Sequence, residues 1–343
     1  MPQPLLTDLT AAEPGLPRIL HGLARRAPLN FARRAAEVAW ELGSAALLDR
    51  LMPLRNALHE VSPGRAAPSG KALALYLHWS PSGAISAMVR AQIAGWRQGG
   101  FDVVFITNAA QRPPAPDWDA VGAETVLRIH RANVGRDFGG WRAGATLALE
   151  RFGAPDELLL ANDSVLGPIR PMAPLLATWR GGGEGVFGMT ESLAGGPHLQ
   201  SYALLARGTS AVAQLVDHLS AFGDSRSKWR LVQQGELGLA RRLRAAGVRE
   251  AALFGYARLL AEVDDATRVS LGPRFAEAGA LQRYPLNPCH HFWRVLLERM
   301  EFPYLKTELV RRNPGRLPGV GEWAALVPPA EAALIRAHLE IMG

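Results

Sequence analysis

Apolar residues follow two different rhythms along the chain, and the rhythm changes near residue 62. Before that point they recur at intervals of three and four residues, as in the series Phe31, Ala35, Val38, Leu42 and Ala45. This spacing is typical of one face of an amphipathic helix, so we expect helical structure over 14–60. We accordingly predict an N-terminal helical arm over residues 1–61.

The other side of this arm is basic. Arg25, Arg26, Arg33 and Arg34 lie on or near the face opposite the apolar one. Such a helix can lie on a membrane surface that contains anionic lipids, or it can pack on the main domain as an ordinary arm. We favour the packed arm, and a peripheral contact with a membrane stays open as the alternative.

A short linker separates the arm from a region in which strands and helices alternate. Residues 62–70 have the sequence SPGRAAPSG, and clusters of Pro, Gly and Ser are typical of connecting segments. The strands that we expect beyond the linker are 72–78, 101–107, 125–129, 157–161, 186–190 and 202–206. The helices that we expect are 84–98, 211–221 and 229–246.

This alternation predicts an α/β fold. Short strands separated by helical segments of about 10–15 residues indicate a mostly parallel, Rossmann-like sheet with crossover helices on its faces. We assign this α/β domain to residues 71–285. Residues 286–343 are helical in pattern and rich in aromatic side chains, and we expect them to form a C-terminal helical extension packed on the domain.

The charge of the chain argues against a nucleic-acid partner. The chain has 343 residues and a formal net charge of +7, and of its 38 basic residues only Lys71, Lys228 and Lys306 are lysines. Arginine combined with abundant Ala, Gly and Pro indicates a general compositional bias with dispersed, solvated side chains rather than a polyanion-binding surface. A smaller anion, such as a diphosphate or a lipid headgroup, remains open as a partner.

Cys289 is the only cysteine of the chain. A single cysteine excludes an internal disulfide framework and any zinc or iron–sulfur site built from several cysteines. Residues 1–17 lack the basic start and apolar core of a secretory signal, and no run approaches the roughly 18 apolar residues that cross a bilayer. We expect a cytoplasmic protein that could lie at the inner face of the cytoplasmic membrane.

The most informative stretch lies between residues 131 and 165. Its first polar loop, Asn133-Val134-Gly135-Arg136-Asp137, follows a predicted strand. Gly135 frees the backbone to turn, and Asp137 can cap the helix that follows. The apolar stripe of that helix is ordinary core packing.

A second polar loop, Asn162-Asp163-Ser164, follows the buried run at 158–161. In parallel α/β sheets ligands bind beyond the carboxyl ends of the strands, so both loops should converge on one site. An acid there can hold a divalent cation that bridges the two phosphates of a nucleotide diphosphate. The alternative is a plain turn that caps the next segment.

Several ordered motifs carry a resemblance to a known family. They are N-x-G-R-D-F-G-G-W from Asn133, L-L-L-x-N-D-S-V-x-G-P from Leu158, GMTES at 188–192 and HLQSY at 198–202. The closing segment adds Asn287-Pro288, Phe292-Trp293, Phe302-Pro303, Lys306 and Arg312-Asn313-Pro314. Together they resemble the rhamnan synthesis protein F family over about residues 71–314. The resemblance implies a bacterial polysaccharide-assembly protein of glycosyltransferase A type, an inverting enzyme that uses an activated sugar such as dTDP-rhamnose.

The resemblance also implies roles for individual residues. The nucleotide-sugar donor would be held by Asn133, Gly135, Arg136, Asp137, Asn162, Asp163 and Ser164. Asp163 is the one acid that remains of an Asp-x-Asp pattern, so it is the candidate ligand of a divalent cation, Mg²⁺ or Mn²⁺, and the need for that cation is open. Arg136 or a neighbouring arginine could partly replace it. The acceptor would be a growing surface polysaccharide, a lipopolysaccharide glycan or a lipid-linked glycan.

A general base must take the proton of the acceptor hydroxyl as its oxygen attacks the anomeric carbon. Glu236 resembles the base of inverting transferases of similar layout. Glu191 and His198 are rivals, because the loop that joins strands 186–190 and 202–206 should line the same cleft. His198 and Gln200 could instead bind sugar hydroxyls.

Other acidic and metal-binding residue types are expected to lie outside the site. The pairs Asp117/Asp119 and Asp264/Asp265 are expected on the solvated surface, and Cys289-His290-His291 lacks further clustered ligands.

Two other functions stay open. A non-catalytic glycan-binding or assembly module would retain the fold without turnover, which the incomplete acidic triplet at 162–164 favours. A nucleic-acid binder is the weaker third hypothesis.

Overall fold

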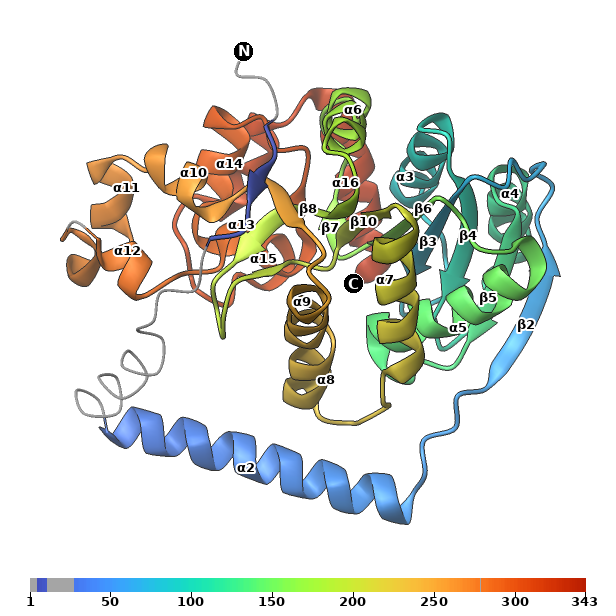
Figure 1. Cartoon of the computed structure of the whole chain (residues 1–343). Helices are drawn as coiled ribbons and strands as arrows, with labels where there is room; N and C mark the ends of the chain where they lie inside the picture. The colour runs from blue at the N-terminus through green and yellow to red at the C-terminus, as the bar shows by residue number, and fades with distance from the viewer. Residues whose placement is uncertain (1–4, 11–27, 278) are drawn as a thin grey trace.

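The computed structural model describes residues 5–10, 28–277 and 279–343, which form a mixed sheet with helices on both faces (Figure 1). In these residues the sheet has ten strands in the order β1-β11-β8-β10-β6-β3-β4-β5-β2, with β9 beside β8. The strands are β1 (Thr7–Asp8), β2 (Leu58–Pro63), β3 (Ala72–His78), β4 (Asp102–Thr107), β5 (Leu127–Arg131), β6 (Glu157–Asn162), β8 (Gly185–Ser192), β9 (His198–Leu199), β10 (Ala203–Arg207) and β11 (Glu250–Phe254). A separate two-stranded sheet pairs β7 (Val165–Leu166) with β12 (Leu305–Lys306).

The helices surround this sheet. They are α2 (Pro28–Leu51), α3 (Ala87–Gln98), α4 (Ala115–Glu124), α5 (Arg136–Phe152), α6 (Ala173–Gly181), α7 (Thr209–Ala221), α8 (Lys228–Gln234), α9 (Glu236–Ala245), α10 (Tyr256–Ala261), α11 (Asp265–Ser270), α12 (Ala280–Arg283), α13 (Pro288–His291), α14 (Trp293–Arg299), α15 (Thr307–Arg312) and α16 (Pro329–Met342). Two 3₁₀ helices, η1 (Pro273–Phe275) and η2 (Val320–Leu326), complete the chain.

The centre of the sheet is parallel. Strands β6, β3, β4 and β5 run in the same direction, and Tyr76 of β3 lies between Phe105 of β4 and Ala161 of β6. All seven residues of β3 are buried, because helices cover both faces and a strand with two covered faces reads as a continuous apolar run. Strand β10 runs antiparallel between β6 and β8.

Each face of the sheet has its own apolar core. Alternate residues of β3, such as Leu75, pack with α5, α7 and α9 on one face. The other set, such as Tyr76, packs with α3, α4, α6 and the C-terminal helices. A third apolar cluster joins α16, α15 and η2 to the segment that follows β6. The C-terminal residues therefore reach the end of β6, where the polar triplet 162–164 lies.

The α/β class and the mostly parallel sheet flanked by helices are confirmed. Each of the six expected strands is present, and its first and last residues lie within two residues of the expected ones. The helix expected over 229–246 is divided at Gly235 into α8 and α9. The division into an arm, a linker, a domain and an extension stays a prediction.

The expectation of helix over residues 14–60 is wrong at its C-terminal end, where Leu58–Pro63 form strand β2. This strand pairs antiparallel with β5, because β5 would otherwise present an open edge to solvent. The expected linker 62–70 therefore begins inside the sheet, and the N–H groups of Gly64 and Ala66 donate to the carbonyls of Val126 and Thr125.

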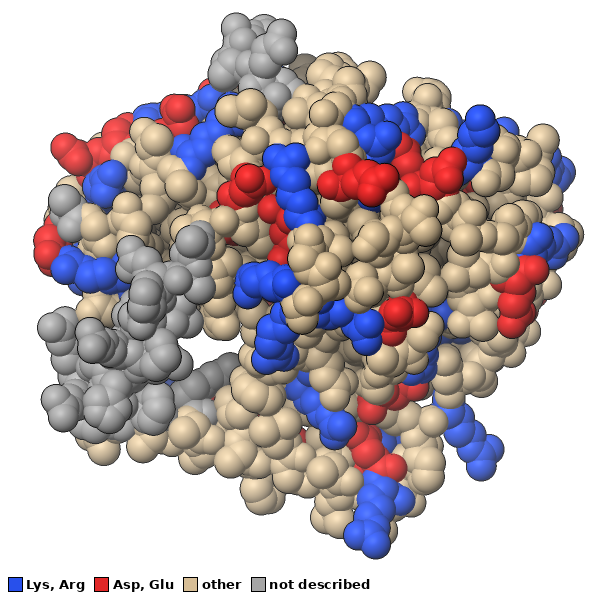
Figure 2. All heavy atoms as spheres, viewed as in Figure 1, with Lys and Arg blue, Asp and Glu red and all other residues tan. Residues whose placement is uncertain are grey.

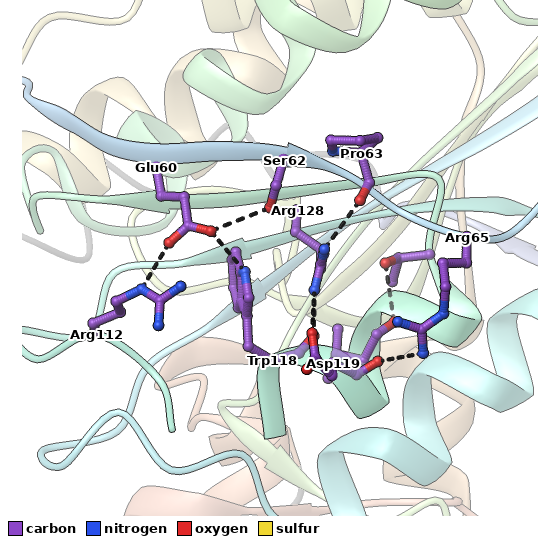
Figure 3. A network of polar contacts seen from close by, with 10 residues as sticks. Glu60, Ser62, Pro63, Arg65, Arg112, Trp118, Asp119 and Arg128 are labelled. Carbon is purple, nitrogen blue, oxygen red and sulfur yellow. Dashed lines mark hydrogen bonds and ion pairs between the residues drawn. The ribbon is translucent and has the colours of Figure 1, made fainter. Parts of the chain in front are cut away.

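Side-chain contacts also fix β2 to the domain (Figure 3). Glu60 accepts hydrogen bonds from Arg112 Nε at 2.8 Å and from the Trp118 indole at 2.9 Å. The Arg112 guanidinium lowers the pKa of Glu60 below its usual value. Arg128 donates to the Pro63 carbonyl at 3.1 Å, so β2, β5 and α4 form one polar network.

Helix α2 lies along the outside of the molecule and touches the loop before α8 (Figure 1). Glu41 accepts from the Ser227 hydroxyl at 2.9 Å, and Asp49 pairs with Arg226 at 2.7 Å. In the predicted apolar series, Ala45 is buried, Val38 and Leu42 are half-buried, and Ala35 is exposed. The residues Arg25 and Arg26 and the side chains of Phe31 and Arg34 lie outside the described part of the chain. Among the described helices, none has the length and apolar character needed to span a bilayer.

Candidate functional site

A cleft lies at the carboxyl ends of β3, β4, β5 and β6. It consists of two cavities of about 500 Å³ and about 440 Å³, which share the lining residues Trp79, Arg136, Asp137 and Asp163. A smaller cavity of about 160 Å³ continues it toward α8 and α9. This is the edge of a parallel sheet at which ligands bind, and both polar loops singled out in the sequence converge there.

A buried arginine at the end of β5 holds the first polar loop in place. Arg131, at the end of β5, is fully buried and donates to Asn56 Oδ1 at 2.7 Å, to Asn108 Oδ1 at 2.8 Å and to the Val134 carbonyl at 2.7 Å. Burial lowers the pKa of Arg131 to about 10, so the guanidinium stays charged at neutral pH. Its contacts fix the path of the chain as it enters the cleft.

Gly135 and Arg136 form the turn that leads into α5. Gly135 has a φ of +72°, and a Cβ at this position would lie 2.4 Å from Asp224 Oδ1, so only glycine fits. Arg136 also has a positive φ, +50°, which is uncommon for a residue with a side chain. The strained turn places the exposed Arg136 side chain and the first turn of α5 at the mouth of the cleft.

Helix α5 is anchored so that Asp137 faces the end of β6. Trp141 is fully buried and its indole N–H donates to the Leu75 carbonyl at 3.1 Å. Phe138 packs against Trp141 and Phe222, with ring centroids 5.3 Å away in each case. Asn162 then donates from Nδ2 to Asp137 Oδ2 at 3.0 Å, which joins the two polar loops directly.

The strand-end triplet presents one acid to the cleft. Asp163 Oδ2 accepts from the Trp79 backbone N–H at 2.8 Å. Burial raises the pKa of Asp163 to about 7, and the negative charge of Asp137 adds to the rise. Burial also raises the pKa of Asp137. Two carboxyl groups from separate loops therefore share a confined space, as the sequence predicted.

The same space is lined by basic side chains that were not predicted to belong to the site, although Lys306 and Arg312 stand in the closing segment that carries the motif resemblance. Lys306 donates from Nζ to Ser164 Oγ at 2.9 Å, and its ammonium lies 5.1 Å from the centroid of the Tyr202 ring. Lys228, Arg226, Arg311 and Arg312 also line the cleft. The signal that could have found the lysines is their rarity, because two of the three lysines in an arginine-rich chain lie here.

The end of β3 contributes two further residues that the sequence did not single out. His78 and Trp79 line the cleft directly after the strand. Burial lowers the pKa of His78 to about 3, so its imidazole is neutral, and Nδ1 lies 3.0 Å from Thr107 Oγ1. Their place at the carboxyl end of the first predicted strand was the available signal.

Glu236, the predicted base, lines the cleft at the first residue of α9. Its Oε1 accepts from the Ser201 N–H at 3.0 Å and from the Ser201 hydroxyl at 2.7 Å. His198 Nε2 lies 3.7 Å from Glu236 Oε2, and His198 Nδ1 lies 2.7 Å from the Gly196 carbonyl oxygen. His198 is buried behind the carboxylate, and it is not among the described residues that line the cleft. Gln200 does line it.

Glu191, the rival base, is placed elsewhere. Its two oxygens accept from the N–H groups of Thr10 at 2.6 Å and of Tyr256 at 2.9 Å, and from the Thr10 hydroxyl at 3.1 Å. The Glu191 side chain is buried beneath the N-terminal segment that contains Thr10, and it does not line the described cleft. The sequence did not show the cause, because the short strand β1 that brings Thr10 to this point pairs with β11, more than 240 residues away.

The remaining sequence candidates lie outside the cleft. Asp119 is exposed, but Asp117 is only partly exposed and accepts from the Ile85 N–H at 2.8 Å at the start of α3. Asp264 caps α11. Cys289 is buried, and the described residues contain no group of three or more His, Cys, Asp or Glu side chains arranged to hold a metal ion.

Comparison with known proteins gives little beyond this geometry. No family model matches the chain. The chain is similar to the uncharacterized protein y4gN of Sinorhizobium fredii, with 28% identity over 151 residues. That match covers 43% of this chain and 38% of the y4gN protein, so it spans less than half of either and assigns no family.

Proposed function

We propose that this protein is an inverting glycosyltransferase of the A type that transfers a sugar, rhamnose or a related deoxysugar, from a nucleotide-diphosphate donor to a surface polysaccharide or lipopolysaccharide glycan. The observation that carries the proposal is the cleft at the carboxyl edge of the sheet. There Asp137 and Asp163 share the lining with Arg136, Lys228 and Lys306, which form no ion pair with a carboxylate among the described residues. The motif resemblance to rhamnan synthesis protein F supports the choice of sugar and acceptor.

The basic side of the cleft suits the diphosphate of the donor. Arg136, Lys228 and Lys306 line it, and within the described residues none of the three forms an ion pair with a carboxylate. Cations fixed at this place stabilise the charge that develops on the leaving diphosphate. Asn133, Gly135 and Asn162 offer polar atoms and a close backbone approach for the rest of the nucleotide.

The proposed reaction is a single displacement. The acceptor hydroxyl oxygen attacks the anomeric carbon and forms the new glycosidic bond, while the bond to the diphosphate oxygen breaks and its electron pair leaves with the nucleoside diphosphate. Glu236 takes the hydroxyl proton. Ser201 orients the carboxylate through two hydrogen bonds, and His198 supports it from behind as a positioning residue. Gln200 would bind a sugar hydroxyl.

The experiment that tests this function uses dTDP, UDP and GDP in calorimetric titrations, followed by turnover of dTDP-rhamnose with and without a glycan acceptor. The proposal predicts that one nucleotide binds and that its sugar is consumed. Binding without turnover would favour the non-catalytic glycan-binding module, which the incomplete acidic triplet also suits. No binding of any nucleoside diphosphate would contradict the glycosyltransferase.

We also propose a peripheral contact between α2 and the cytoplasmic membrane, where a lipid-linked acceptor would lie. The outward side of α2 carries Leu29, Trp40, Leu47 and Leu51, whose spacing of 11, 7 and 4 residues places them on one helical face. Leu29 is 85% and Trp40 is 80% exposed. Glu41 and Asp49, by contrast, lie on the side that faces α8, where they contact Ser227 and Arg226.

The charges at this stripe suit anionic headgroups. Arg33 and Arg50 are exposed beside it, and Arg33 also pairs with Glu37 at 3.4 Å. The lower rim of the molecule, where α2 runs, is tan over much of its length, with acidic and basic side chains together at its right-hand end (Figures 1 and 2). An apolar stripe flanked by arginines is typical of helices that lie in the membrane interface.

Flotation with vesicles tests this contact. The double variant W40S/L47S should lose binding to vesicles that contain phosphatidylglycerol, while V269S, which changes an exposed residue of α11, should bind as the unmodified protein does. Equal binding by the double variant would contradict the contact. A dimer that dissociates in the same variant would assign the stripe to a second copy of the chain instead.

A further inference from the structure

Lys306 lies directly beside the polar triplet Asn162-Asp163-Ser164. It pairs with Val165 in the β7–β12 ladder, and its ammonium donates a hydrogen bond to Ser164, the residue that follows Asp163. The neighbouring Thr307 donates from its N–H to the Ser164 carbonyl at 3.0 Å and from its hydroxyl to the Asp163 carbonyl at 3.2 Å. The lysine is therefore held in register with the triplet before any ligand binds.

The ammonium acts on both carboxylates of the cleft. The positive charge of Lys306 lowers the pKa of Asp137 and of Asp163 against the upward effect of burial. The face of the Tyr202 ring lies beside the ammonium, which favours the charged amine. Lys306 thus lies within electrostatic reach of the two groups that a divalent cation would have to join.

The residues of the cleft do not fit such a cation well. Asp137 Oδ2 accepts from Asn162 and Asp163 Oδ2 accepts from the Trp79 N–H, so each carboxylate would have to bind a cation through its Oδ1. Ser164 offers a hydroxyl instead of a carboxylate, and that hydroxyl is the acceptor for Lys306. A divalent cation that bridged Asp163 and Ser164 would lie against an ammonium, and the like charges would repel each other.

We propose that Lys306, together with Lys228 across the cleft, supplies the positive charge at the diphosphate, so that the nucleoside diphosphate binds without a divalent cation. This inference rests on the proposed function of the same cleft. The site would bind the metal-free form of the diphosphate, and the two lysines would contact its phosphate oxygens as point charges.

Calorimetric titration with dTDP and with inorganic pyrophosphate, in EDTA and then in Mg²⁺ or Mn²⁺, tests the inference. For the unmodified protein we expect dissociation constants in EDTA and in metal to agree within about twofold. K306M, which keeps the length of the side chain without its charge, should weaken binding about tenfold or more, and K306R should recover part of the loss. K71M is the matched control, because Lys71 lies in a cavity at the opposite edge of the sheet, and it should bind normally.

Each outcome decides between the two proposals. Binding that requires Mg²⁺ or Mn²⁺, or K306M that binds as tightly as the unmodified protein, overturns the inference and leaves the proposed function standing. No binding of dTDP, UDP, GDP or pyrophosphate under any of these conditions overturns the proposed function and the inference with it. Thermal unfolding of K306M shows whether the variant is folded, and K228M repeats the test at a residue that is exposed on the helix surface.

Discussion

A cavity and the candidate cleft lie at opposite ends of the strands of one sheet, and they differ in how their charged side chains are paired. The cavity at the amino ends of β3 and β6, about 570 Å³, is lined by Lys71, Glu157, Arg180 and Arg207. There the Glu157 carboxylate is paired with Arg180 at 2.8 Å and with Arg207 at 2.8 Å. In the cleft at the carboxyl ends, the cations of Arg136, Lys228 and Lys306 have no such partner among the described residues.

This difference separates a structural cavity from a candidate site. The two ion pairs of Glu157 hold β6, α6 and β10 together, and of the basic residues that line this cavity only Lys71 lacks an ion pair among the described residues. Charges without a partner leave a field that an anion can satisfy. Over the face seen in Figure 2, acidic and basic side chains are interspersed, so local pairing, and not the total charge of +7, distinguishes the two cavities.

The largest expected effect is on turnover. E236Q removes the base of the proposed reaction and should lower the rate of sugar transfer by about 10²- to 10⁴-fold, while the nucleotide still binds within about twofold of its normal affinity. E184Q, at the opposite cavity, should leave the rate unchanged. A steady-state assay of nucleoside diphosphate release measures both, and equal rates for E236Q and E184Q would remove Glu236 from the mechanism.

A glycine in each cavity sharpens the comparison through stability. G135A forces a Cβ to within 2.4 Å of Asp224 Oδ1 at a positive φ, whereas Gly183 has a φ of +82° with nothing within 4 Å. We expect G183A to lower the free energy of unfolding by about 1 kcal/mol and G135A to lower it by clearly more, with loss of nucleotide binding. Urea unfolding checks the order, and similar losses for both variants would show that the turn is not tightly fixed.

A third expected effect is a dependence of stability on pH. Because burial raises the pKa of Asp163 to about 7, the folded protein holds this proton above the pH at which the unfolded chain releases it. Stability contributed by the protonated group is therefore present below about pH 4 and is lost as the pH rises toward 7, by at most about 1.4 kcal/mol per pH unit.

The variant D163N isolates this contribution. It should gain stability relative to the unmodified protein between pH 5 and pH 7.5 in urea unfolding, although Glu250, whose pKa burial also raises to about 7, keeps part of the slope in both proteins. A constant difference between the two proteins across this range would contradict the burial of Asp163.

The centre of the fold was predictable because burial on both faces leaves an unmistakable pattern. Strand β3 is apolar along its whole length, and the polar loops that follow β5 and β6 mark the edge at which they end. The edge strand β2 was missed because its residues are mostly exposed or half-buried, so pairing with β5 and not periodicity determines its structure.

The candidate site was predictable only where it is local in sequence. Asp137 lies in the first turn of the helix that follows β5, and Asp163 directly follows β6. Lys306, by contrast, reaches Ser164 across 142 residues through the two-residue strands β7 and β12. Such short pairings leave no pattern to detect. Glu191 was expected to line the cleft, but it is buried by an N-terminal segment that is distant in the sequence.

Chemical labelling of the three lysines tests the central claim most directly. The unmodified protein is treated with acetic anhydride, with and without a bound nucleoside diphosphate, and the modification of each lysine is measured by mass spectrometry. We expect the nucleotide to protect Lys228 and Lys306 and to leave Lys71 fully reactive. Protection of Lys71, or equal reactivity of Lys228 and Lys306 with a nucleotide shown to be bound, would place the ligand elsewhere and contradict the account.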